Sequence, residues 1–305
     1  MHIAQVSEWG KAPKYVEVDT PPMPTPESGL VQIKVAATGL HQLVRSRAAG
    51  SHYSSAGLPH YPGVDGVGTT PDGQIVYFLV FQTGGSFSEI INVPKQSIMP
   101  LPTGLDPLQA AAFTNPALSS WLALNARTDH LPKDFSILIM GATSVSGSMA
   151  IPLSRALGAK KVIGVARNTD TLSTLGLDDT IILKDPVEET DFSKANDVDV
   201  IIDYLYGPPA EHLLQTLNPT RPVQYIHIGA LAGLDITLPG AVLRSKNLTI
   251  RGSGPGAWSM RTAAAQIPKM LQAMSKIEPR KVNAVPLREV EKAWDVKGDR
   301  TVFTP

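Results

Sequence analysis

An apolar run that ends in a glycine-bounded turn constrains the fold of this chain more than any other feature. Residues 137–140 (Ile-Leu-Ile-Met) predict a buried strand, and the turn after them runs from Gly141 to Gly147, where a helix of residues 147–157 begins. Such a strand, turn and helix open a dinucleotide-binding βαβ unit, in which free N–H groups at the helix N-terminus hold a pyrophosphate. The middle glycine of the usual pattern is replaced by Ser144. An ordinary βα turn therefore stays the alternative.

The end of the next expected strand points to the kind of dinucleotide. Residues 161–166 predict this strand, and Arg167 follows it at the position where an NAD site usually carries an acidic residue for the ribose hydroxyls. A guanidinium at that position suits a 2′-phosphate. The sequence therefore predicts NADPH as the cofactor, with a solvated surface arginine as the alternative interpretation of Arg167.

Composition excludes several classes of protein. Lys plus Arg and Asp plus Glu number 27 each, which gives no electrostatic reason to expect nucleic acid or an anionic membrane as a partner. The chain has no cysteine, which excludes disulfides, thiolate-bound zinc, iron–sulfur clusters and cysteine nucleophiles. No apolar run has the length of a membrane span, and the first residues do not resemble a signal peptide. We expect a cytoplasmic enzyme.

The pattern of strands and helices changes along the chain. Short β-type runs predict strands in the first hundred residues, at 2–7, 14–18, 30–36, 74–80 and 86–93. Two helical stretches follow, one after Asp106 and one at 117–125. Alternation then predicts strands at 136–140, 161–166, 180–183, 198–203, 223–229 and 248–252, with helices near 147–157, 170–175 and 208–217. This order predicts an α/β fold with a doubly wound parallel sheet.

The last part of the chain predicts a helix near 260–276, a strand at 281–287, a short helix at 288–295 and a strand that ends at Phe303. This β-rich piece is too small to stand alone, so we expect it to rejoin the N-terminal domain. A ligand cleft between two lobes would follow from that arrangement.

Six further segments occur in an order that resembles one protein family. They are Pro-Gly-Val-Asp-Gly-Val-Gly at 62–68, the strand pair at 85–94, Asn-Pro-Ala-Leu-Ser-Ser-Trp-Leu-Ala-Leu at 115–124, Ile-Gly-Ala at 228–230, Arg-Gly-Ser-Gly at 251–254 and the ending at 300–305. Across the whole chain, the sequence resembles the medium-chain dehydrogenase/reductase superfamily, in particular its zinc-free quinone-oxidoreductase branch. The segment after Gly39, Leu-His-Gln-Leu-Val-Arg, departs from most members.

The resemblance implies a domain plan. Residues 1–118 are expected to form a chaperonin-10-like β-barrel catalytic domain, residues 119–258 the dinucleotide-binding domain, and residues 259–305 a return segment that completes the catalytic domain. Members are commonly homodimers. The turn, the strand end and the matched segments together predict the cofactor-binding residues Asn115, Ser119, Gly141, Thr143, Ser144, Val145, Ser146, Gly147, Arg167, Gly229, Ala230, Gly252 and Ser253.

Metal ligation is not expected. Zinc members of the superfamily bind the metal through cysteine, which this chain lacks. A cysteine-free site from His52, His60 and Asp65 has suitable residue types, but their spacing matches no helix-based motif such as His-Glu-x-x-His. The other histidines are expected to be satisfied core or surface residues, at positions 2, 41, 130, 212 and 227.

The candidate proton donor is Tyr53, which resembles the glycine-x-tyrosine segment of related enoyl reductases, here with one extra residue. The alternative is a half-buried loop tyrosine whose hydroxyl is in water. His52 and Arg45 are further candidates for stabilising an oxyanion.

Three functions are compatible with these features. The first is NADPH-dependent reduction of quinones or α,β-unsaturated carbonyl compounds by hydride transfer without a metal. The second is an enoyl-thioester reductase of fatty-acid or polyketide type. The third is a catalytically silent NADPH-binding protein, for which Ser144 is the hint. The expected partner is a small-molecule substrate, not nucleic acid or a membrane.

Overall fold

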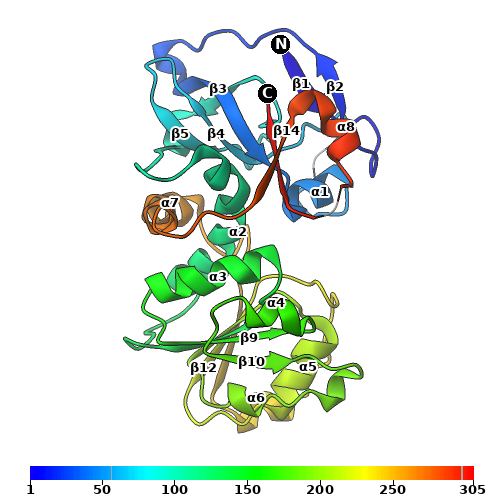
Figure 1. The fold of residues 1–305 in the computed structure, drawn as a ribbon, viewed down its shortest axis with the longest axis vertical. Coiled ribbons are helices and arrows are strands. Elements are labelled where there is room, and N and C mark those ends of the chain that lie inside the picture. Colours follow the sequence, from blue (N-terminus) through cyan, green and yellow to red (C-terminus); the bar gives the residue numbers. More distant parts are fainter. Residues whose placement is uncertain (56, 297) are drawn as a thin grey trace. The chain divides into compact units, whose positions relative to one another are not determined.

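Two large sheets organise the chain, and each belongs to a different unit of the computed structural model (Figure 1). The structure describes residues 1–55, 57–296 and 298–305. One unit comprises Met1–Asn115 with Ile267–Pro305, and the other is the continuous segment Pro116–Gln266. No helix within the described residues is long and apolar enough to cross a membrane.

The sheet of the continuous unit consists of six parallel strands. They are β8 (Ser136–Met140), β9 (Lys161–Ala166), β10 (Asp179–Ile182), β11 (Val200–Asp203), β12 (Val223–His227) and β13 (Leu248–Gly252). Their spatial order is β10-β9-β8-β11-β12-β13, so the order reverses between β8 and β11. This confirms the predicted doubly wound parallel sheet. Such a reversal is where ligands bind in this class of fold, outside the carboxyl ends of the strands.

The central strands of this sheet, β8, β9 and β11, are buried on both faces, which explains why they are mostly apolar runs. All five residues of β8 are buried. Ile137 and Ile139 contribute to one apolar cluster, while Leu138 and Met140 contribute to another, as alternation along a strand requires. The unit's helices are α3 (Val145–Ala156), α4 (Thr169–Ser173), α5 (Gly207–Thr216) and α6 (Gly240–Ser245), with 3₁₀ turns at Val187–Glu189 and Ser193–Ala195.

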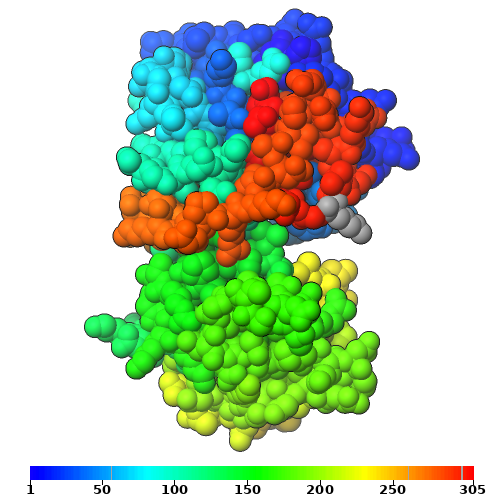
Figure 2. All heavy atoms as spheres, in the orientation of Figure 1, coloured from blue at the N-terminus to red at the C-terminus, as the bar shows by residue number. Residues whose placement is uncertain are grey.

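The other unit has a mostly antiparallel sheet with the order β14-β15-β3-β4-β5-β7, and β6 also pairs with β3. These strands are β3 (Leu30–Gly39), β4 (Asp65–Thr69), β5 (Ile75–Leu79), β6 (Ile90–Pro94), β7 (Ile98–Pro100), β14 (Val282–Pro286) and β15 (Arg300–Thr304). A two-stranded sheet pairs β1 (His2–Gln5) with β2 (Lys14–Glu17). The last residues, red in Figure 2, lie against the blue N-terminal residues of the same unit.

Short helices complete this unit. They are α1 (Gln42–Ala48) and α8 (Val290–Ala293), with 3₁₀ turns at Pro26–Ser28, Lys95–Ser97 and Leu287–Glu289. Neither α1 nor β4 was predicted from the sequence. Strand β4 was missed because its glycines serve a tertiary contact. A Cβ at Gly68 would lie 2.5 Å from the Lys34 carbonyl oxygen. The glycines of β4 therefore permit close contact with β3 and do not mark a turn.

The long helix α2 (Pro107–Ala126) replaces the two helical stretches that the sequence predicted. Pro116 lies inside it and has no N–H, so the carbonyl of Ala112 loses its usual donor in the next turn. The side chain of Arg300 replaces the missing donor, because its Nε–H donates to the Ala112 carbonyl oxygen at 2.9 Å. The boundary between the two units falls within α2 and, on the return, within α7 (Met260–Met274).

A buried polar network lies at the start of β4. Asp65 is fully buried and accepts a hydrogen bond from the Tyr77 hydroxyl at 2.7 Å. Nε2 of His41 lies 2.8 Å from its other carboxylate oxygen. Burial lowers the pKa of His41, and the nearby carboxylate of Asp65 opposes that shift. His41 is therefore a core histidine whose neutral form is favoured by folding.

We predict that His41 makes the protein less stable in mild acid. Because its folded-state pKa lies below the usual 6.5, the stabilisation is complete above pH 6.5 and is lost as the pH falls through the folded-state pKa. The wild-type free energy of unfolding should fall by up to about 1.4 kcal/mol per pH unit more steeply than that of His41→Gln. Denaturant unfolding between pH 8 and pH 5 measures this, with exposed His130→Gln as the control. Equal slopes in wild type and His41→Gln would contradict it.

Candidate functional site

A cavity of about 710 Å³ lies at the carboxyl edge of the parallel sheet. This volume is in the range of ligand pockets, roughly 300–1,000 Å³. Every lining residue belongs to one of five strand ends or the segment that follows it: Gly141, Thr143 and Ser144 after β8; Ala166 and Arg167 at β9; 183–188 after β10; Leu205, Pro208 and Pro209 after β11; Leu231 and Ala232 after β12. The cavity therefore occupies the switch point of the sheet, where a nucleotide is expected.

The turn between β8 and α3 needs its two glycines. Gly141 has φ +84°, a conformation that other residues rarely adopt. A Cβ at Gly147 would lie 2.2 Å from the Gly141 carbonyl oxygen, so only glycine lets the helix start this close to the turn. The helix N-terminus is thereby fixed beside the cavity.

Ser144, which replaces the middle glycine, is the N-cap of α3. Its Oγ accepts a hydrogen bond from the Gly147 N–H at 3.0 Å. Val145 and Ser146 occupy the first two helical positions, where N–H groups have no partner within the helix. The substitution therefore caps the helix and keeps N–H groups at its start that can face an anion.

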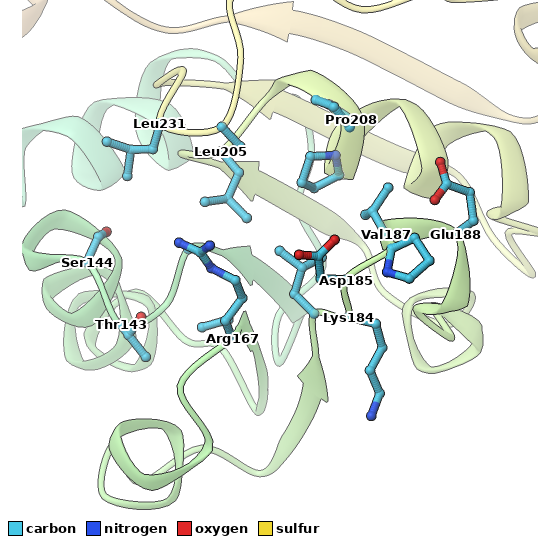
Figure 3. A pocket seen from close by; sticks show the side chains of 16 residues that line it. Thr143, Ser144, Arg167, Lys184, Asp185, Val187, Glu188, Leu205, Pro208 and Leu231 are labelled. Carbon is cyan, nitrogen blue, oxygen red and sulfur yellow. The ribbon is translucent and has the colours of Figure 1, made fainter.

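Arg167 lies at the end of β9 and lines the cavity. Its guanidinium points into the cavity in Figure 3, whereas the side chain of Lys184 points away from it. Within the described part of the chain, no acidic side chain lies within ion-pair distance of Arg167, although Asp185 also lines the cavity. The guanidinium is thus exposed and open to an anionic group of a ligand.

The structure divides the predicted cofactor residues into those at the cavity and those elsewhere. Gly141, Thr143, Ser144 and Arg167 line it, and Val145, Ser146 and Gly147 follow in the first turn of α3. Gly229 and Ala230 follow β12, and Gly252 and Ser253 lie at the end of β13. Ser119 is on α2 beside the buried Tyr204, their oxygens 3.1 Å apart, and Asn115 is the last residue of the first segment of the other unit.

The three catalytic candidates lie on α1 and the segment after it. The side chain of Tyr53 is 75% exposed, and its ring packs on that of His52 with centroids 4.2 Å apart. Arg45 donates to the Trp294 carbonyl and lies 5.6 Å from the centre of the Trp294 ring. Asp295 is 3.8 Å from the same guanidinium. Arg45 therefore contacts Trp294 and Asp295, the two residues that directly follow α8.

His52 has a defined tautomer. The backbone N–H of Ser54 lies 3.1 Å from Nδ1 of His52 and can only donate, so Nδ1 is the acceptor. The neutral ring then carries its proton on Nε2. Burial lowers the pKa of His52, and the positive charge of Arg47 lowers it further, so the neutral donor form is favoured.

Sequence reasoning missed all of the lining after β10, β11 and β12, including Asp185, Leu205 and Leu231. The signal was present in the order of the strands, because the carboxyl ends of parallel strands all lie at one edge of the sheet. Of the metal-type residues considered, Asp65 is engaged by His41 and Tyr77. Within residues 1–55, 57–296 and 298–305, no three His, Asp or Glu side chains gather as a metal site requires.

Known proteins resemble this chain over its full length. No protein-family model matches it. The "Probable NADPH-dependent quinone reductase tdiC" of Emericella nidulans is 33% identical, with 100% of both chains covered. The acrylyl-CoA reductase AcuI of Ruegeria pomeroyi is 28% identical over 62% of this chain and 63% of its own. The quinone oxidoreductase of Thermus thermophilus, solved also in complex with NADPH, matches with a TM-score of 0.76 at 23% identity over 100% of both chains, which shows a shared fold.

The fold, the site and these relatives together define a class. The chain belongs to the medium-chain dehydrogenase/reductase superfamily. Within the superfamily it belongs to the zinc-free quinone-oxidoreductase-like branch, as the sequence predicted.

Two substitutions at Ser144 test its capping role. Ser144→Ala removes the acceptor for the Gly147 N–H and should lower the free energy of unfolding by about 1 kcal/mol. Ser144→Gly restores the usual glycine and should cost only about 0.3 kcal/mol, because glycine is tolerated at an N-cap. Chemical denaturation of both variants measures the difference. Equal losses would show that the serine oxygen does not cap α3.

Proposed function

We propose that this chain is an NADPH-dependent oxidoreductase that reduces quinones or α,β-unsaturated carbonyl compounds. The observation that carries the proposal is the exposed guanidinium of Arg167, which points into the cavity from the end of β9 (Figure 3). At this strand end a nucleotide's ribose is expected, and an arginine there matches a 2′-phosphate. The printed names of the relatives point to the same cofactor and reaction.

The residues present fit this cofactor. Gly141 adopts φ +84°, and a Cβ at Gly147 would clash with the Gly141 carbonyl oxygen, so this turn keeps the start of α3 beside the cavity. The N–H groups of Val145 and Ser146 would hold the cofactor's pyrophosphate. When bound, NADPH supplies a hydride to an electron-poor carbon of the substrate.

The chain's own residues then orient the reactants and manage charge on the substrate oxygen. We assign Tyr53 Oη as the first candidate to donate a proton or hydrogen bond to that oxygen. His52 is the second candidate, because its Nε2–H is a donor whose position Ser54 fixes. Arg45 is the third, and its positive charge would act from α1. Ser119, Gly229, Ala230, Gly252, Ser253 and Asn115 complete the proposed cofactor contacts.

An enoyl-thioester reductase is the second candidate function. The name of the relative AcuI, an acrylyl-CoA reductase, favours it. A quinone and a conjugated thioester both place negative charge on oxygen after hydride addition, so the same donors serve both reactions. Steady-state turnover of a quinone and of a crotonyl thioester separates the two. NADPH binding with no turnover of either would favour the catalytically silent protein.

Three further assignments concern the domain boundaries, the cellular compartment and the oligomeric state. We propose residues 1–118 and 259–305 as the catalytic domain and 119–258 as the dinucleotide domain. We also propose a cytoplasmic homodimer, as is common in this family. β13 supports the dimer, because it is an edge strand with the apolar side chain of Ile250 37% exposed. Light scattering coupled to gel filtration measures the molecular mass in solution.

Arg167→Glu tests the cofactor assignment. Loss of a charge-assisted hydrogen bond of about 2 kcal/mol should weaken NADPH binding about thirtyfold and leave NADH binding nearly unchanged. Lys184→Glu is the matched control, since it makes the same charge change at the cavity from a side chain that points away from Arg167. Fluorescence titration gives both dissociation constants. Equal affinity of the wild type for NADPH and NADH would overturn the assignment.

Tyr53→Phe tests the proton donor. Removal of the hydroxyl should lower kcat about tenfold to a hundredfold, while the dissociation constant for NADPH stays within about twofold. Tyr61→Phe is the control, because Tyr61 is also an exposed tyrosine of the same unit. Unchanged kcat in Tyr53→Phe removes this residue from the mechanism, and His52→Gln then becomes the next variant to measure.

A further inference from the structure

A fully buried carboxylate organises the turn that follows β11. Asp203 is the last residue of that strand. Its carboxylate accepts the backbone N–H of Leu205 at 2.7 Å and that of Tyr206 at 3.0 Å. The hydroxyl of Tyr225, on the neighbouring strand β12, also donates to it. A buried charge needs such hydrogen bonds, and here two of them define the path of the backbone after the strand.

The turn contains a conformation that only specific contacts maintain. Tyr206 has φ +54° and ψ −158°, where a residue with a side chain is strained. Its N–H is held by Asp203, and its ring packs on His227 with centroids 4.1 Å apart. Gly207 follows with φ +58° and begins α5. The carboxylate of Asp203 is therefore a direct partner of the strained residue.

The segment after β12 is attached to the same turn along its backbone. The N–H of Gly229 donates to the Asp203 carbonyl at 3.1 Å. The N–H of Leu231 donates to the Tyr204 carbonyl at 3.0 Å, and that of Ala232 to the Leu205 carbonyl at 2.7 Å. We call residues 203–207 and 229–233, with these bonds, the clasp.

Two glycines let the halves of the clasp touch. A Cβ at Gly233 would lie 2.8 Å from the Cα of Gly207, closer than real side chains approach a backbone atom. No side chain separates the two backbones at this point. The position of residues 229–233 is thus tied to the path that Asp203 imposes on residues 203–207.

The clasp forms one wall of the nucleotide cavity. Leu205, Leu231 and Ala232 all line it, and Figure 3 shows both leucine side chains at the cavity. Leu205 also packs on the turn between β8 and α3, since a Cβ at Gly141 would lie 3.1 Å from Cδ2 of Leu205. The side chain of Asp203 is not part of the lining, so any effect on a ligand must pass through these neighbours.

We propose that Asp203 is a positioning residue for cofactor binding, which acts by holding the clasp in the shape that the cavity needs. This inference rests on the proposed function, since it takes the cavity as the NADPH site. The carboxylate does not touch the ligand. Its hydrogen bonds place Leu205 and Leu231 at the cavity wall, and a small displacement of such a wall is costly for binding.

Asp199 offers a matched control on the same segment. It directly precedes β11, is buried, and its Oδ2 accepts the backbone N–H of Ser136 at 2.7 Å and the Ser136 hydroxyl at 2.8 Å. Asp199 is therefore also a buried carboxylate with a backbone and a side-chain donor, but it lies at the amino edge of the sheet. A purely structural role would make the two positions equivalent.

The experiment compares Asp203→Asn with Asp199→Asn. In each variant an amide NH₂ replaces a carboxylate oxygen and faces a donor, so both should melt at a lower temperature than the wild type. Asp203→Asn should raise the NADPH dissociation constant about tenfold or more, and Asp199→Asn should leave it within about twofold. An unchanged constant in Asp203→Asn, or equal increases in both variants, overturns the proposal.

A second pair of measurements separates this inference from the proposed function. Gly233→Ala disturbs the clasp at its backbone contact, leaves Asp203 in place, and should weaken NADPH binding in the same way. Hydrogen exchange of the Gly229, Leu231 and Ala232 amides needs no cofactor and should accelerate in Asp203→Asn but not in Asp199→Asn. Failure of the wild type to bind NADPH rejects the proposed function and, with it, the role of Asp203 in cofactor binding, whereas the exchange measurement still tests the clasp itself. Unchanged exchange in Asp203→Asn rejects the clasp.

Discussion

The close approach of helix α3 to the turn after β8 is the contact on which the site depends. Gly147 leaves no space for a side chain against the Gly141 carbonyl, so the start of the helix is held at the carboxyl edge of the central strand. Gly164 on β9 makes room from the other side, since a Cβ there would lie 3.0 Å from the Cβ of Ala142. These contacts bring helix N–H groups to the point where the strand order reverses.

The two strands that flank β8 contribute opposite kinds of charged residue. β9 ends beside the exposed Arg167, whose guanidinium is open to the cavity, while β11 ends in the fully buried Asp203. Exposure makes the first suited to an anionic ligand. Burial commits the second to backbone N–H groups of its own chain. A positive group and a negative group thus serve one cavity without neutralising each other, because only one of them faces it.

Sequence reasoning succeeded where the signal was local. The inner strands β8, β9 and β11 of the parallel sheet were found because they are buried on both faces and are therefore mostly apolar. The antiparallel strand β4 was missed because its glycines are required by close contacts with β3, which lies about thirty residues earlier in the sequence. The sequence predicted two helical stretches where the structure has the single helix α2, and nothing local to Pro116 shows that Arg300 supplies the missing donor.

The same distinction applies to the site. Gly141, Ser144 and Arg167 were proposed from one short stretch, and all three line the cavity. Leu205, Leu231 and the role of Asp203 were not foreseen, because the clasp depends on hydrogen bonds between segments that follow different strands. A buried acid at the end of an apolar strand was the available signal, but its role depends on contacts between segments that are distant in sequence. The assignments of Tyr53, His52 and Arg45 remain predictions.

The way in which β15 returns to β3 has a consequence for how the protein is made. Residues 116–266 are contiguous, so every strand of the parallel sheet has been synthesised before Ile267 is added. The other unit needs Phe303 beside Thr38 and the guanidinium of Arg300 at the Ala112 carbonyl. During synthesis the nucleotide-binding half can therefore reach its native pairing first, while the half that surrounds it in sequence must wait for the final residues.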